Sequence, residues 1–145
     1  LSDNLKHVLH GSNSQFVSLQ KEIEYLDNYI DFQKIRTEGV KTINYIKEID
    51  SLNYEIAPLL LIGIIENAFK HSATNTTIDI HIKMSDGELY CHCKNVIATP
   101  KSKENNTVIG LQNLKKRLSL LYPDKHSLDF IENDYFIANL KIKLQ

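Results

Sequence analysis

Residues 58–71 read Pro-Leu-Leu-Leu-Ile-Gly-Ile-Ile-Glu-Asn-Ala-Phe-Lys-His, and this stretch decides the fold. Its first half is apolar at almost every position, which is typical of a buried helix. At about 100° per residue, one arc of the second half collects Gly63, Glu66, Asn67, Lys70 and His71. Buried polar groups need partners, and Gly63 leaves a gap without a side chain among them. The pattern therefore predicts a site for a ligand that is not protein.

A simpler interpretation of the same residues stays open. The polar side chains can mark the point at which a buried helix reaches solvent, with Lys70 and His71 favourably placed at its negative C-terminal end. A second segment, about forty residues downstream, bears on the choice between the two interpretations.

Composition narrows the class of protein. The 145 residues, 42% of them hydrophobic, suit one globular domain with a sizeable core. A formal net charge of −1 argues against nucleic acid as the main partner. No apolar run reaches the roughly 18 residues of a membrane span, and no signal-peptide pattern opens the chain. Because the sequence begins with Leu1 rather than Met, we expect a piece of a longer protein.

The two cysteines are expected to be reduced thiols in the core of a cytosolic protein. Cys91 and Cys93 alternate along a predicted strand and therefore share one of its faces. Their Cα atoms would lie about 6.6 Å apart with parallel side chains, which disfavours a disulfide. His92 points the opposite way, so the three residues would make a poor metal chelate.

Apolar periodicity divides the first half of the chain into elements. Residues 1–10 resemble the end of a helix that began upstream. An amphipathic helix is predicted from the N-cap Ser18 to Thr37, because apolar side chains recur at helical spacing from Leu19 to Ile30. A strand over 40–49 and a short segment over 53–56 precede the helix that begins at Pro58.

The second half predicts two hairpins separated by a loop and a helix. The strands are expected over 77–84, 88–94, 126–132 and 135–144, and the helix from Gly110 to Leu121. Residues 95–108 lack periodicity, and a loop of about 14 residues is usually a lid or binding loop, although an ordinary surface loop stays open. Hairpins favour a mixed, mostly antiparallel sheet with helices on one face, which is an α/β two-layer sandwich.

The two polar segments together predict a nucleotide site. A helix that starts at Gly110 offers unpaired N–H groups to phosphate, and the glycine lets the backbone approach closely. Asn67 supplies an amide oxygen for Mg²⁺, whose coordination substrate phosphates complete. Glu66 can orient or deprotonate a metal-bound water or acceptor, while Lys70 and His71 can donate to phosphate.

These residues carry a resemblance to a known family. Three segments contribute: Ala57-Pro58-Leu59-Leu60-Leu61 with Ile65-Glu66-Asn67-Ala68-Phe69-Lys70-His71, then Ile109-Gly110-Leu111-Gln112-Asn113 with Leu121-Tyr122-Pro123, and Leu19 to Ile30. They resemble the N-box, the G2 box and the preceding helix of sensor histidine kinases of the LytS/YehU type. The resemblance implies the Bergerat (GHKL) ATP-binding fold of the gyrase, Hsp90 and MutL ATPases. It implies a catalytic ATP-binding domain over 15–145, after the tail of a dimerisation and phosphoacceptor region over 1–14.

The resemblance also implies roles for single residues, with ATP and Mg²⁺ as cofactors. Asn67 would hold Mg²⁺, Glu66 would serve the catalytic water or base role, and Lys70 and His71 would face the phosphates. The phosphate-side wall under a lid would consist of Gly110, Leu111 and Asn113. Asn95 would accept a hydrogen bond from adenine through its amide oxygen.

Three departures from the family pattern are visible. Val108 stands where the G2 box usually has its first glycine, and Asn95 replaces the usual aspartate without glycines after it. The phosphoacceptor motif lies upstream of this chain, and His7 and His10 are interpreted as surface or core histidines. The first two departures indicate weaker or altered nucleotide binding.

The leading functional hypothesis is the catalytic domain of a histidine protein kinase. It would donate the ATP γ-phosphoryl to a histidine upstream of this fragment, and a response regulator would continue the relay. The implied partners are the dimerisation region of a homodimeric parent and the cognate response regulator, with no nucleic acid. We expect a cytoplasmic domain of a membrane-anchored parent.

Two other classes stay open. One is a degenerate Bergerat-fold module with weak or no nucleotide binding that acts by docking to proteins. The other is an ATPase of the gyrase or Hsp90 kind, which fits the fold but would lack the extra transducer domain at this length.

Overall fold

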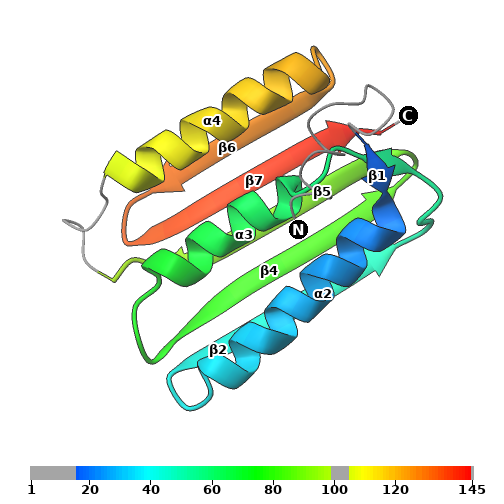
Figure 1. The fold of residues 1–145 in the computed structure, drawn as a ribbon. Coiled ribbons are helices and arrows are strands. Elements are labelled where there is room, and N and C mark those ends of the chain that lie inside the picture. The colour runs from blue at the N-terminus through cyan, green and yellow to red at the C-terminus, as the bar shows by residue number, and fades with distance from the viewer. Residues whose placement is uncertain (1–15, 99–104, 145) are drawn as a thin grey trace, which may run out of the picture.

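The structure, a computed structural model, describes residues 16–98 and 105–144, and for 105–109 only the backbone. Helices α2, α3 and α4 cover one face of a five-stranded sheet (Figure 1). The sheet order is β2-β4-β5-β7-β6, with β2 parallel to β4 and the remaining neighbours antiparallel. The α/β two-layer sandwich with a mixed, mostly antiparallel sheet is therefore confirmed.

The helices and strands have the following bounds. The helices are α2 (Leu19–Arg36), α3 (Leu60–His71) and α4 (Asn105–Leu121). The strands of the main sheet are β2 (Lys41–Ile49), β4 (Thr76–Ser85), β5 (Glu88–Val96), β6 (His126–Glu132) and β7 (Tyr135–Lys143). A separate antiparallel pair joins β1 (Val17–Ser18) to β3 (Glu55–Ile56).

Local chemistry explains where several elements begin and turn. The side chain of Ser18 accepts a hydrogen bond from Lys21 N at 3.1 Å, so α2 begins at the predicted N-cap. Strands β4 and β5 are joined at Asp86 and Gly87, whose φ angles of 52° and 81° suit a tight hairpin turn.

The core lies between the helices and the sheet. Alternate side chains of the central strands face the helices and are buried: Ile78, Ile80, Ile82, Met84, Leu89, Cys91, Cys93, Ala138, Leu140 and Ile142. Cys91 and Cys93 are both buried and free, which confirms the prediction of two core thiols. None of the described helices is long and apolar enough to span a bilayer.

The predicted loop over 95–108 is wrong at both ends. Strand β5 continues to Val96, because Asn95 and Val96 pair with Phe136 and Tyr135 of β7, a partner that local periodicity does not reveal. Helix α4 begins at Asn105 rather than at Gly110. The sequence from 101 to 109 contains neither glycine nor proline, so nothing in it stops the helix from extending toward its N-terminus. The predicted region over 1–14, with His7 and His10, lies outside the described residues.

Candidate functional site

A small cavity lies between helices α3 and α4. Its volume is about 190 Å³, and its lining consists of Gly63, Glu66, Asn67, Lys70, His71, Gly110 and Leu111. Residues from the two polar segments, which the sequence separates by about forty positions, thus meet at one place. Every α3 residue singled out for its position on the polar arc contributes to this lining.

The two sides of α3 differ as the sequence predicts. The apolar side is buried against the sheet and the other helices, through Leu60, Leu61, Ile64, Ile65, Ala68 and Phe69. On the other side Glu66 and Lys70 are exposed, while Asn67 and His71 are half-buried. The polar groups are therefore carried by a helix whose other side is packed in the core, and they line the cavity.

Two glycines make room in the cavity wall. A Cβ built on Gly63 or on Gly110 would meet nothing within 4 Å. Both residues lie inside helices, where glycine costs roughly 1 kcal/mol relative to alanine. Glycine therefore lowers helix stability at two positions where packing within the protein would also accept alanine. Both positions border the cavity.

Tyr29 of α2 lies close to this site, although the sequence indicated only a core aromatic. Its ring makes an edge contact with Phe69, with centroids 5.7 Å apart. Burial raises the pKa of Tyr29, and the negative charge of Glu66 raises it further. The phenol is thus a neutral neighbour of the Glu66 carboxylate. Its place in the apolar stripe of α2 gave no signal of this proximity.

The phosphate-binding helix start expected at Gly110 is not present. Because α4 begins at Asn105, Gly110 is not among its first four residues, whose N–H groups have no intrahelical acceptor. Gly110 contributes open space to the cavity instead of a helix terminus. Asn113 is exposed on α4 and lies outside the residues that line the cavity, so its role remains a prediction.

Asn95 occupies the end of β5 near the C-terminus of α3. It is 1% exposed, and its amide donates to the carbonyl of Val96 at 3.2 Å. Backbone bonds join this strand end to the residues around His71: Ala73 N donates to Val96 O, and Ala98 N donates to His71 O. Asn95 does not line the cavity, and its contact with adenine remains a prediction.

The donor set fits a cation that takes few protein ligands. In the described part of the chain, no group of three or more His, Cys, Asp or Glu side chains is arranged to hold a metal. Mg²⁺ differs from most metals in this respect, because it keeps several waters and is often bound through one or two protein oxygens plus phosphates. Asn67 and Glu66 offer such hard oxygens at the cavity.

A larger open hollow lies at the other end of the helices. Its volume is about 900 Å³, and it is lined by Phe16, Ser18, Gln20, Leu52, Asn53, Tyr54, Glu55, Leu121, Tyr122, Lys125, Lys143 and Leu144. Its charged lining residues are Glu55, Lys125 and Lys143, and its lining includes no residue from the polar arc of α3. The cavity between α3 and α4 is therefore the better candidate for a functional site.

Sequence comparisons find similarity to histidine kinases. A family model described as histidine kinase matches residues 1–40. Sensor protein kinase HptS of Staphylococcus aureus is 27% identical over 137 residues, an alignment that covers 84% of this chain and 26% of HptS. The chain thus spans about a quarter of the length of this curated relative.

Structural comparisons find the same class of protein. The catalytic domain of histidine kinase ThkA matches with a TM-score of 0.60 at 12% identity, covering 89% of this chain and 95% of that domain. ThkA in complex with the response regulator protein TrrA matches with a TM-score of 0.60 at 13% identity, over 99% of this chain and 47% of ThkA. The fold of histidine kinase catalytic domains and the resemblance to sensor histidine kinases are therefore confirmed. The LytS/YehU type stays a prediction.

Proposed function

We propose that this chain, a relative of sensor histidine kinases with the fold of their catalytic domains, binds ATP and donates its γ-phosphoryl to a histidine of the parent kinase. One observation carries the proposal. Glu66, Asn67, Lys70 and His71 border one cavity together with Gly110 of a different helix. If the polar residues only marked the point at which α3 reaches solvent, there would be no need for α4 to face them or for Gly63 and Gly110 to leave open space between the two helices.

Each of the four polar side chains in the lining has a proposed role in phosphoryl transfer. Asn67 would hold Mg²⁺, which neutralises phosphate charge when bound. Lys70 and His71 would donate hydrogen bonds to phosphate oxygens. Glu66 would accept the proton of the attacking group, or orient that group. Such catalysis consists mostly of positioning and charge neutralisation, so side chains carried by a helix whose apolar side is packed in the core suit it.

The partners and location of the parent are part of the same proposal. The acceptor histidine would belong to a dimerisation region that precedes this domain, and the family-model match to residues 1–40 supports such a neighbour. The complex of ThkA with TrrA supports a response regulator as the next partner. We place the domain in the cytoplasm, as part of a membrane-anchored homodimer.

A second candidate function is a degenerate module that binds nucleotide weakly or not at all and acts by docking to proteins. The course of α4 favours it. The helix runs without a glycine from Asn105 to Ile109, where the family pattern expects a flexible phosphate loop. The two candidates differ in one measurable property, which is nucleotide affinity.

Calorimetric titration of the 145-residue chain with a non-hydrolysable ATP analogue distinguishes the candidates. We expect binding that depends on Mg²⁺ and that is lost in Asn67→Ala. The matched control is Asn28→Ala, which removes an exposed amide from α2 and should leave affinity unchanged. Absence of binding up to millimolar analogue would favour the docking module over the kinase domain.

A further inference from the structure

The helix that carries the candidate site cannot cap its own N-terminus. Leu59 occupies the N-cap position with a left-handed φ of 65°, and its side chain makes no capping hydrogen bond. The first turn of α3 contains no acidic residue. Helix starts leave four N–H groups without an intrahelical acceptor, so these groups need a partner from elsewhere.

Glu22 of α2 is that partner. Its side chain is on the buried face of α2, where the residue is only 4% exposed, and its Oε1 accepts a hydrogen bond from Leu59 N at 3.1 Å. Burial raises the pKa of Glu22, while N–H groups at the start of α3 and the charge of Arg117 oppose that rise. The carboxylate thus lies at the positive end of the α3 dipole.

Lys41 holds the opposite end of the same helix. Its ammonium donates a hydrogen bond to the carbonyl of Phe69 at 3.1 Å, in the last turn of α3. A cation beside the final carbonyls of a helix complements the negative end of its dipole. Opposite charges therefore contact opposite ends of α3, each with the favourable sign.

Both contacts come from one continuous segment. Glu22 lies near the start of α2, and Lys41 is the first residue of β2, which follows α2 directly. The cavity residues Glu66 and Asn67 lie between the two contacts along α3. Because this segment forms a hydrogen bond with each end of α3, it restricts movement of the helix along its own axis.

We propose that Glu22 and Lys41 are positioning residues that set the axial position of α3, and thereby place Asn67 and Glu66 against the Gly110 wall of the cavity. The inference rests on the proposed nucleotide function. Misplacement of binding groups by about 1 Å can cost roughly 100-fold in catalysis. Neither Glu22 nor Lys41 lines the cavity, so each would act only through α3.

The test compares charge-removing variants with matched controls. Glu22→Gln and Lys41→Met should each bind the Mg²⁺ complex of the ATP analogue roughly tenfold more weakly, at a temperature at which circular dichroism shows them folded. Lys41→Arg should bind this complex with wild-type affinity, because arginine keeps a positive charge at the C-terminal end of α3. Glu24→Gln and Lys34→Met remove exposed charges from α2 and should bind like wild type.

Hydrogen exchange provides a readout that does not depend on nucleotide. Both Glu22→Gln and Lys41→Met should speed amide exchange throughout α3 without speeding it in β5, because each variant removes a charge that complements one end of the α3 dipole. Wild-type affinity in both folded variants would overturn the positioning role. If the wild-type chain binds no nucleotide, the proposed function fails, and exchange alone decides: faster exchange confined to α3 supports the positioning role, whereas unchanged exchange overturns it.

Discussion

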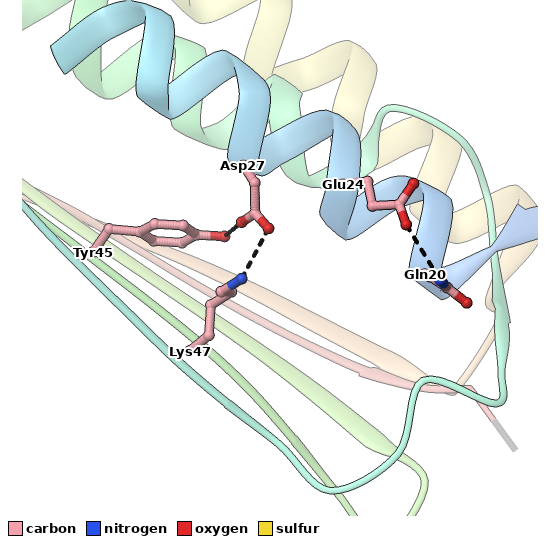
Figure 2. Close-up of polar contacts among 5 residues, drawn as sticks. All are labelled: Gln20, Glu24, Asp27, Tyr45 and Lys47. Atoms are coloured by element: carbon pink, nitrogen blue, oxygen red, sulfur yellow. Dashed lines mark hydrogen bonds and ion pairs between the residues drawn. The ribbon is translucent and has the colours of Figure 1, made fainter.

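The hydroxyl of Tyr45 donates a hydrogen bond to Asp27 Oδ1 at 2.7 Å, and this bond ties the edge strand β2 to helix α2 (Figure 2). Lys47 Nζ lies 2.8 Å from the other carboxylate oxygen of Asp27. Burial raises the pKa of Tyr45, and its hydrogen bond to Asp27 raises it further. The folded protein therefore favours the neutral phenol.

Tyr45→Phe should lower the free energy of unfolding by about 1 kcal/mol, because a partly buried hydrogen bond is lost. Lys47→Met should have a smaller effect, about 0–1 kcal/mol, since the side chains of this ion pair are 37% and 33% exposed. Urea denaturation measures both changes. Tyr25→Phe is the control, because Tyr25 is 52% exposed. If the urea midpoints of Tyr45→Phe and wild type are identical, the Tyr45 hydroxyl does not stabilise the fold.

The same tyrosine should contribute to unfolding at alkaline pH. Because its folded pKa lies above the ordinary value of 10.0, the folded state keeps a proton that the unfolded chain releases. The stabilisation is complete below that ordinary value and is lost as pH rises beyond it. The stability advantage of wild type over Tyr45→Phe should therefore shrink at alkaline pH, as chemical denaturation at several pH values can measure. An advantage that does not change with pH would contradict the shifted pKa.

Gly63→Ala and Gly110→Ala should each raise the free energy of unfolding by roughly 0.5–1 kcal/mol, because alanine is the better helix former and its Cβ meets open space. Each should also weaken binding of the ATP analogue, since the added methyl group occupies the cavity wall. Thermal unfolding and calorimetry measure the two effects separately. Gly39→Ala is the contrasting variant: its φ of 79° disfavours alanine, so stability should fall. Stabilised variants with full affinity would show that the ligand does not use this space.

Glu22 predicts a pH dependence of stability in the acid range. Its folded pKa is raised from 4.5, so the folded state holds a proton that the unfolded chain has released. The free energy of unfolding should therefore fall as pH rises from the unfolded pKa toward the folded one. Glu22→Gln lacks this component, so the difference between the two proteins should change as pH rises above the ordinary value of 4.5. Parallel curves for wild type and variant would contradict a raised pKa.

The two thiols should be unreactive in the folded protein. Cys91 and Cys93 are 1% and 2% exposed, and a hydrogen bond between them, together with burial, raises the pKa of Cys93. Because the thiolate is the reactive form, an aromatic disulfide reagent should react with both only after unfolding in denaturant. Rapid reaction in native buffer would show that the sheet face opens locally.

Local patterns predicted the elements that depend on neighbouring residues. The N-cap Ser18 and the Asp86-Gly87 turn follow from side-chain chemistry within four residues, and both are present. The polar arc of α3 also follows from helical spacing alone, and its residues do share the cavity. What the sequence could not show is pairing at a distance, such as Asn95 with Phe136, which extended β5 beyond its predicted end.

Glu22 is a second case in which the sequence does not reveal a distant partner. A glutamate that follows Leu19 by one helical turn and precedes Ile23 interrupts an apolar stripe, which is a signal of a buried charge. The pattern does not say which group satisfies that charge. Its partner, the N–H group of Leu59, lies 37 positions away and has no side-chain signature.

The parallel pairing of β2 with β4 has a kinetic consequence, because α3 lies in the connection between these two strands. Closing such a crossover costs chain entropy before the strands can pair, so this step should be slow relative to hairpin formation. Two hairpins can form early, because a short turn joins their strands: β4 with β5, and β6 with β7. The site helix would then dock in the same late event that adds the edge strand, and a chain arrested before that event would have most of its sheet and no cavity.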